Sequence, residues 1–228
     1  MSISCTCIEC KIGSKCFSKL IPDELRFINQ KKTQIQYRKG ENICKQGAFA
    51  SYVLYITNGL VKLYLENTNN KFTNIKILKA KDFIGLASIY GENIYNYSVI
   101  TLKETDVCLI DKIAIRKLLE SNSAFASEMI KRYCYWEKYF FSVIKSISYK
   151  QMPGRLADVF LNLDSDEYKN EDVYNYITRK DIADFACISK ESTIRLLSEF
   201  KNEGIIDTSG KNIVILKPDK LREISRLG

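Results

Sequence analysis

Short runs of alternating apolar and polar residues dominate the chain from about position 21 to 115. The segments SYVLYITNGLVKLYLE, KFTNIKILKAKDFIGL and YSVITLKETDVCLID combine β-branched and aromatic residues with turn residues at roughly every 8–12 positions. Because every second side chain of a strand lies on the same face, this pattern predicts an antiparallel β-barrel or β-roll. A generic β-sandwich would have the same pattern. Within the first segment, Asn58-Gly59 predicts a hairpin turn.

The pattern then changes to a helical period in SAFASEMIKRYCYWEKYFFSVIKSISYKQ, which contains neither glycine nor proline. Bulky residues recur there at spacings of 4, 3, 4, 3 and 4, the a/d pattern of a coiled coil. We therefore expect a dimerisation helix over residues 121–150. The alternative is a helix that lies on the core of its own domain. The predicted dimer seam consists of Met129, Tyr133, Trp136, Phe140, Val143 and Ile147.

Residues 151–228 predict a winged helix-turn-helix. Thr178 and Ser189 are suitable N-caps for two helices separated by only Cys187 and Ile188. Two short strands follow, with a hairpin tip at Ser209-Gly210. Helix, tight turn, helix and hairpin is the order of a winged DNA-binding domain. A plain helical hairpin packed on a sheet is the structural alternative.

The second of these helices has a polar face suited to the major groove. Arg195 can donate to guanine O6 and N7, and Glu191, one turn earlier, can accept from cytosine N4. The two could instead form a surface ion pair worth a few tenths of a kcal/mol. Ile194 lies on the same face, where it could contact a thymine methyl group. The predicted DNA contacts are Arg179, Ser189, Lys190, Glu191, Ile194 and Arg195.

Composition narrows the function classes. The chain has 228 residues, a formal net charge of +8 and no histidine. Without histidine there is no mixed Cys/His zinc site and no Ser-His or Cys-His nucleophile, so we expect a protein that is not an enzyme. The N-terminus does not resemble a signal peptide, and no apolar run approaches the roughly 20 residues of a membrane span. The sequence predicts a cytoplasmic protein that does not contact a membrane.

Four of the eight cysteines, Cys5, Cys7, Cys10 and Cys16, lie within the first 16 residues. Thiols stay reduced in the cytoplasm, so disulfides are the weakest explanation, and metal binding or redox chemistry is favoured. The remaining cysteines are Cys44, Cys108, Cys134 and Cys187. Buried free cysteine behaves as a small hydrophobic residue, and we expect that role for Cys44, Cys134 and Cys187.

Taken together, these elements resemble the CRP/FNR family of bacterial transcription regulators. The most specific segments are YRKGENICKQG, DFIGL and TRKDIADFACISKESTIRLLSEFKNEGII. The resemblance implies an α+β fold with a cyclic-nucleotide-binding-like β-roll, a long dimerisation helix and a winged helix-turn-helix. It also implies a homodimer that binds palindromic promoter sites in double-stranded DNA, with RNA polymerase as a further partner. The expected domains are 1–20 (cysteine segment), 21–120 (β-roll), 121–150 (dimerisation helix) and 151–228 (DNA-binding domain).

Two substitutions separate the chain from the cAMP-binding branch of that family. Leu86 follows Gly85 where that branch has glutamate, and Tyr97 precedes Ser98 where it has arginine. The carboxylate and the guanidinium that would hold the nucleotide are both missing. We therefore expect no cAMP binding.

The cysteines instead resemble those of FNR-type oxygen sensors. Cys7, Cys10 and Cys16 have the spacing C-x2-C-x5-C, and Cys108 stands where that type takes its fourth ligand. The resemblance implies a [4Fe–4S] cluster on these four residues that senses oxygen or nitric oxide, with Cys5 as a spare. The same four thiolates could hold zinc. The chain could also be a regulator without a cluster that responds to another ligand or to thiol oxidation, or a small metal or redox protein with no DNA role.

Overall fold

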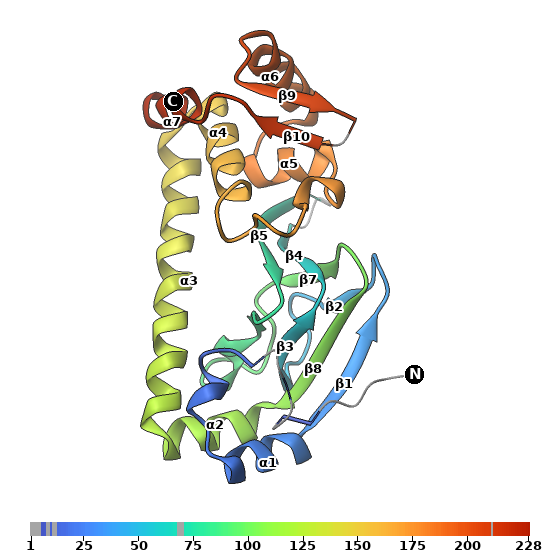
Figure 1. The fold of residues 1–228 in the computed structure, drawn as a ribbon, viewed down its shortest axis with the longest axis vertical. Helices are drawn as coiled ribbons and strands as arrows, with labels where there is room; N and C mark the ends of the chain where they lie inside the picture. The colour runs from blue at the N-terminus through green and yellow to red at the C-terminus, as the bar shows by residue number, and fades with distance from the viewer. Residues whose placement is uncertain (1–5, 8–9, 11–12, 68–70, 211) are drawn as a thin grey trace. The chain divides into compact units, whose positions relative to one another are not determined.

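Two four-stranded β-sheets form most of the N-terminal half of the chain in the computed structural model, which describes residues 6–7, 10, 13–67, 71–210 and 212–228. The chain divides into two compact units. One comprises Met1–Asn70 with Lys76–Glu137, and the other comprises Lys71–Ile75 with Lys138–Gly228. The elements are labelled in Figure 1, and the α+β fold expected from the sequence is confirmed.

The first sheet has the strand order β1-β8-β3-β6 and the second has the order β2-β7-β4-β5. In the first, β8 pairs antiparallel with both β1 and β3, and in the second, β7 pairs antiparallel with β2 and β4. The strands are β1 (Lys32–Tyr37), β2 (Asn42–Cys44), β3 (Tyr52–Asn58), β4 (Leu60–Glu66), β5 (Phe72–Lys79), β6 (Phe83–Ile84), β7 (Ser98–Thr101) and β8 (Thr105–Asp111).

The prediction of a hairpin at Asn58-Gly59 is wrong. The residues join β3 to β4, but these strands belong to different sheets. Gly59 has a φ of +109°, and a Cβ at this position would lie 2.3 Å from Oγ1 of Thr105. Glycine is needed because the chain passes tightly over Thr105 as it crosses between the sheets.

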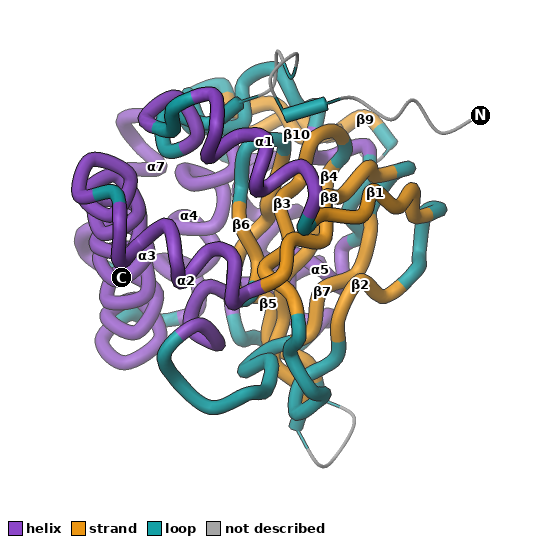
Figure 2. Tube along the Cα trace, turned by 90° about the horizontal axis from the view of Figure 1, so that it is seen from below, coloured by secondary structure: helices purple, strands orange, loops and turns teal. Residues whose placement is uncertain are grey.

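Short helices accompany the β-sheets, and the alternating pattern did not predict them. They are η1 (Phe17–Lys19), α1 (Pro22–Gln30), η2 (Leu86–Ile89) and α2 (Lys112–Ser121). Glu24 begins α1 by accepting a hydrogen bond from the backbone N–H of Ile21 at 2.9 Å. Asp111 does the same for α2 through the N–H of Ile113 at 2.7 Å. Helix α2 packs against α1, η2, β3 and β8 (Figure 2). The expectation of strands over residues 21–115 is therefore corrected at α1, at η2 and at the start of α2.

A single helix, α3 (Ser123–Tyr149), occupies the region of the predicted dimerisation helix. The carboxamide of Asn122 accepts from the N–H of Phe125 at 2.9 Å and begins the helix. Phe125 and Met129 are buried in the core of the β-roll together with Tyr55 and Phe83. This helix is thus attached to the β-roll at its first turns.

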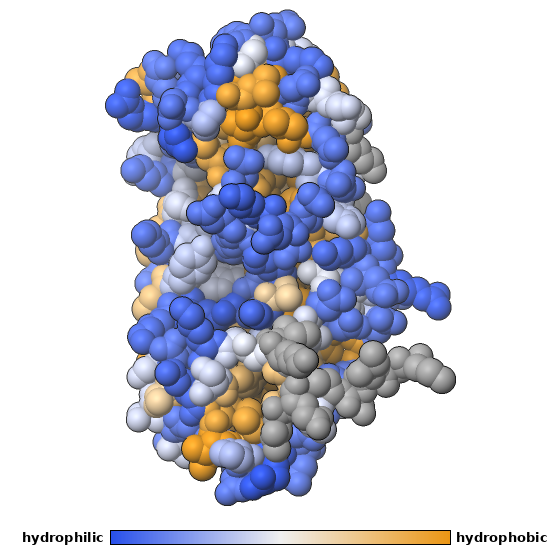
Figure 3. Space-filling model, viewed as in Figure 1, coloured by the Kyte–Doolittle hydropathy of each residue, from blue (hydrophilic) through white to orange (hydrophobic). Residues whose placement is uncertain are grey.

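The second unit contains α4 (Met152–Leu163), η3 (Val173–Asn175), α5 (Arg179–Ala186), α6 (Lys190–Asn202), β9 (Ile206–Ser209), β10 (Asn212–Ile215) and α7 (Pro218–Leu227). Strands β9 and β10 pair antiparallel, and α4 packs against α5 and α7. Helix α7 was not expected from the sequence. In the described part of the chain, no helix is long and apolar enough to cross a membrane. The molecular surface in the view of Figure 1 is largely hydrophilic, with one apolar patch near α1 and α2 and another over β9 and β10 (Figure 3).

Candidate functional site

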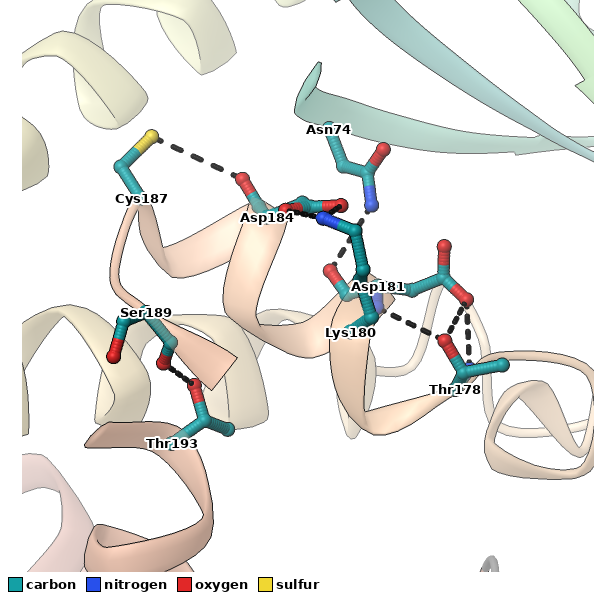
Figure 4. Close-up of polar contacts among 8 residues, drawn as sticks. All are labelled: Asn74, Thr178, Lys180, Asp181, Asp184, Cys187, Ser189 and Thr193. Carbon is teal, nitrogen blue, oxygen red and sulfur yellow. Dashed lines mark hydrogen bonds and ion pairs between the residues drawn. The ribbon is translucent and has the colours of Figure 1, made fainter. Parts of the chain in front are cut away.

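The helix-turn-helix is built by two N-caps and one left-handed residue. Figure 4 shows the cap at Thr178 and the turn that contains Cys187 and Ser189. Oγ1 of Thr178 accepts from the N–H of Asp181 at 3.1 Å, and the Asp181 carboxylate accepts from the N–H of Thr178 at 2.7 Å. Cys187 ends α5 with a φ of +51°. Oγ of Ser189 then accepts from the N–H of Ser192 at 3.0 Å and begins α6. These contacts confirm the caps predicted from the sequence and fix the sharp angle between α5 and α6.

Helix α6 has one buried and one exposed face. The buried face consists of Thr193, Leu196, Leu197 and Phe200. On the other face Lys190, Glu191 and Arg195 are exposed, and Ile194 is 48% exposed. Nη1 of Arg195 lies 3.8 Å from Oε1 of Glu199, so the ion pair of this arginine is directed away from Glu191. An exposed apolar side chain between exposed polar ones suits a helix that contacts base edges.

The two other predicted DNA contacts have structural tasks in this unit. Oγ of Ser189 is engaged as the N-cap of α6. Nη2 of Arg179 donates to the carbonyl of Gly210 at the hairpin tip, at 3.1 Å. Partial burial lowers the pKa of Arg179. Arg179 therefore links the first turn of α5 to the wing, which sets the position of the wing beside the helix-turn-helix.

Three of the four cysteines predicted as ligands line one small cavity of the β-roll. Cys7 and Cys10 of the N-terminal segment and Cys108 of β8 border a space of about 30 Å³. Cys16 is 2% exposed and lies in the same apolar core as Cys108. The N–H of Cys7 donates to Oδ1 of Asn29 at 3.0 Å, which ties the segment to the end of α1. Cys5 lies outside the described residues.

Thiols are the metal-binding groups of this cavity, and no carboxylate lies among the described residues that line it. Burial raises the pKa of Cys16 and of Cys108, while a hydrogen bond from Gln34 opposes the effect at Cys108. Among residues 6–7, 10, 13–67, 71–210 and 212–228, no three side chains of Cys, Asp or Glu are placed to hold a metal ion. A cavity of this volume has room for only one or two water molecules. The four residues are all thiols and lie near one another, so they suit a metal centre bound by thiolates alone. The N-terminal cysteine segment would have to move relative to β8 to bring all four sulfurs within reach of one centre.

Of the cysteines outside this set, the three that the structure describes differ in environment. Cys44 is 7% exposed, and burial raises its pKa to about 12. Its expected role as a small core residue is confirmed. Cys134 is exposed on α3, so the prediction of core packing was wrong there. Cys187 is half-buried in the turn between α5 and α6.

Two tyrosines contact the backbone around Gly85 and Tyr52. The N–H of Gly85, at the start of η2, donates to the hydroxyl of Tyr97 at 2.9 Å. A Cβ on Gly85 would lie 2.8 Å from the ring of Tyr95, and the hydroxyl of Tyr95 donates to the carbonyl of Tyr52 at 3.0 Å. Thus Tyr97, at the position where the cAMP-binding branch has arginine, accepts the hydrogen bond from the N–H of Gly85.

The exposed residues of α3 agree with the predicted seam only in part. Met129 is only 5% exposed and packs inside the β-roll. Val143 and Ile147 line a cavity of about 620 Å³ within the second unit. Trp136 is partly buried with its ring 5.6 Å from Nζ of Lys76. Tyr133 and Phe140 are exposed as predicted, at 57% and 36%.

The exposed stripe, which we call the α3 stripe, consists of Ile130, Tyr133, Glu137, Phe140 and Ile144. Ile130 is 63% and Ile144 57% exposed. These positions have spacings of 3, 4, 3 and 4, so they satisfy the same coiled-coil period as the predicted set. The sequence contained this signal, but the predicted set, which has Trp136 where the stripe has Glu137, obscured it. The corrected stripe includes a carboxylate, whereas the predicted seam was wholly apolar or aromatic.

Comparison with known proteins supports the assignment of both the β-roll and the helix-turn-helix. Residues 34–122 match the model of the cyclic nucleotide-binding domain, and residues 154–224 match the Crp-like helix-turn-helix domain. The chain is 25% identical over 213 residues to the "Anaerobic regulatory protein" of Bacillus subtilis, covering 90% of this chain and 89% of that protein. It is 19% identical over 215 residues to the "CRP-like cAMP-activated global transcriptional regulator" of Mycobacterium tuberculosis, covering 92% and 96%. Among solved structures, FixK2 from Bradyrhizobium japonicum superposes with a TM-score of 0.75 at 21% identity, covering 85% of this chain and 96% of that one.

Proposed function

Because this chain belongs to the CRP/FNR family of DNA-binding transcription regulators, we propose that it is a redox sensor of that family. A [4Fe–4S] cluster on Cys7, Cys10, Cys16 and Cys108 would control its binding to promoter DNA. The observation on which this rests is the gathering of thiols from the N-terminal segment and from β8 at one cavity of the β-roll. The relative from Bacillus subtilis is named an anaerobic regulatory protein, which is consistent with this proposal.

Cysteine is the usual ligand of such clusters, and four thiolates complete the coordination. When bound, the cluster supplies a centre that oxygen or nitric oxide can degrade. The protein's own contribution is to keep the site apolar and to hold the segment on the β-roll. Tyr97 and Leu86 argue against cAMP as the signal, since the nucleotide would lose both of its charged partners.

Phe17 connects the cysteine segment to the rest of the β-roll. Its ring lies 5.0 Å from that of Tyr55, 5.6 Å from that of Phe83 and 6.3 Å from that of Phe125. Phe17 follows Cys16 directly, and Phe125 belongs to the first turn of α3. Any movement of the segment must therefore change the packing around the start of α3. This contact is the route by which we expect the state of the thiols to reach the helix.

We propose in addition that α3 pairs with α3 of a second copy through the α3 stripe. Of the large exposed residues of α3, Ile130, Tyr133, Phe140 and Ile144 have coiled-coil spacing, and Phe141, at 65% exposed, enlarges the apolar surface beside them. In the dimer each α6 would enter a major groove, with Lys190, Glu191, Ile194 and Arg195 toward the DNA. Two-fold symmetry then implies a palindromic site whose halves lie about one helical turn apart, roughly 34 Å. RNA polymerase is the expected partner at the promoter.

The test is anaerobic purification and reconstitution of the full chain, followed by measurement of iron, zinc, sulfide and visible absorption. We expect iron and sulfide in a roughly 4:4 ratio per chain, from the cluster type, and a broad charge-transfer band that disappears in air. Cys108→Ser should lose iron, whereas Cys44→Ser, a buried cysteine of the same β-roll, should retain it. A gel-shift assay with promoter DNA should show binding that differs before and after exposure to air.

Zinc in place of iron would overturn the cluster and support the structural-metal alternative. Full iron content in Cys108→Ser would overturn the assigned fourth ligand. Binding to DNA that is unaffected by air, with no metal present, would favour a regulator that responds to another ligand.

A further inference from the structure

Gln34 is the polar neighbour of Cys108 across the β1–β8 pair. The two residues are directly opposite in the antiparallel register. Nε2 of Gln34 lies 3.6 Å from Sγ of Cys108, within hydrogen-bonding reach of a sulfur acceptor. Cys108 itself is 5% exposed, so water has little access to this sulfur. The carboxamide therefore provides a fixed N–H donor at the only predicted ligand that the β-sheet holds.

A hydrogen bond to a ligand sulfur has two physical effects. It orients the ligand, as outer partners of metal ligands generally do. It also stabilises the form of the centre that bears more negative charge, so hydrogen bonds to the sulfurs help to set the reduction potential of iron–sulfur clusters. In a buried setting the effect is enhanced because the surroundings have a low dielectric constant.

We propose that Gln34 is a positioning residue for Cys108 that raises the reduction potential of the bound cluster and slows its loss in air. The inference rests on the proposed function, since it assumes that Cys108 is a cluster ligand. It extends that function by naming a residue, other than a cysteine, that sets how sensitive the sensor is. Oxidation of the cluster becomes easier when this donor is removed.

The same strand contains a matched control. Gln36 lies two residues further along β1, on the same face, opposite Asp106. Its Nε2 donates to the carboxylates of Asp106 at 3.1 Å and Glu104 at 3.3 Å, and it is exposed. Gln36→Leu therefore removes a carboxamide of equal size from the same strand without affecting a cysteine.

The experiment compares wild type, Gln34→Leu, Gln34→Glu and Gln36→Leu as full chains reconstituted under anaerobic conditions. Iron content, reduction potential by spectroelectrochemical titration and the half-life of the visible band in air are measured. We expect full iron content in all four, with a lower potential and a several-fold shorter half-life in Gln34→Leu. Gln34→Glu, which keeps the size of the side chain but places a carboxylate near the sulfur, should shift both further. Gln36→Leu should match wild type.

Wild-type potential and half-life in both Gln34 variants, at full iron content, would overturn the role of Gln34 and leave the proposed function standing. Equal changes in Gln34→Leu and Gln36→Leu would overturn it too, because they would show a general weakening of β1. Should Gln34→Leu fail to fold by circular dichroism, Gln34→Glu decides alone. If wild type itself binds no iron, the proposed function fails and the inference fails with it.

Discussion

Glu137 provides the most direct test of the proposed dimer interface. It is exposed in the middle of the α3 stripe, between Tyr133 and Phe140. In a two-fold pair of parallel helices, a residue at a seam position faces its own copy. Two carboxylates would therefore approach each other inside an otherwise apolar interface. We predict that Glu137→Leu strengthens dimerisation.

The expected size of the effect follows from two contributions. At the roughly 8–10 Å between packed helix axes, two unit charges repel by roughly 2 kcal/mol at an effective dielectric constant near 20, and salt screening reduces this to about 1 kcal/mol. Each new leucine contributes about 1 kcal/mol if half of its side chain becomes buried. The sum is about 3 kcal/mol, or roughly a 100-fold lower dissociation constant for the dimer.

The assay is sedimentation equilibrium of the cluster-free chain over a wide concentration range. Glu128→Leu is the control, because Glu128 lies on the same helix away from the stripe and pairs with Lys131 at 2.7 Å. An unchanged dissociation constant in Glu137→Leu, or an equal change in Glu128→Leu, would refute the placement of Glu137 in the seam.

The remaining predictions concern α6, the wing and the buried thiol. Arg195→Ala should reduce the free energy of binding to the preferred DNA site by about 1–3 kcal/mol and relax the base preference at one position. Lys190→Ala should weaken binding to all DNA sequences alike. Selection of sites from random DNA with each variant checks both outcomes. Arg179→Ala should make the wing more mobile, which faster amide hydrogen exchange in the hairpin would show. It should also lower the affinity for DNA without changing the selected sequence. Since burial raises the pKa of Cys44 to about 12, its thiol is protonated in the folded chain where the unfolded one has already ionised, so folding stability falls as pH rises above about 9. That loss, about 1.4 kcal/mol per pH unit up to about pH 11, should be smaller in Cys44→Ala and unchanged in the exposed Cys134→Ala, as urea unfolding at several pH values will show.

Much of the fold could be predicted from the sequence because it depends on local pattern. Alternating residues indicated the strands, a long stretch free of glycine and proline indicated α3, and Thr178 and Ser189 marked the starts of α5 and α6. Each of these signals acts over a few neighbouring residues. Capping bonds and side-chain periodicity are properties of a short segment, so they survive in the folded chain.

Pairings between distant segments could not be predicted in this way. Asn58-Gly59 has the composition of a hairpin turn, but β3 and β4 on either side of it belong to different sheets. The close approach of Thr105 to Gly59 accompanies this crossing. Cysteine spacing indicated a ligand set, but only the β1–β8 register places Gln34 beside Cys108.

The α3 stripe shows most clearly which features follow from the local sequence and which depend on the tertiary structure. Two overlapping sets of residues on this helix satisfy the coiled-coil period, and the local pattern favoured the set with Trp136 over the set with Glu137. The β-roll core closes over Met129 and leaves Ile130 exposed. The sequence by itself therefore determined that α3 has an apolar stripe. Only the tertiary structure decided which residues form it, because burial of one face by the β-roll determines which face remains for a partner.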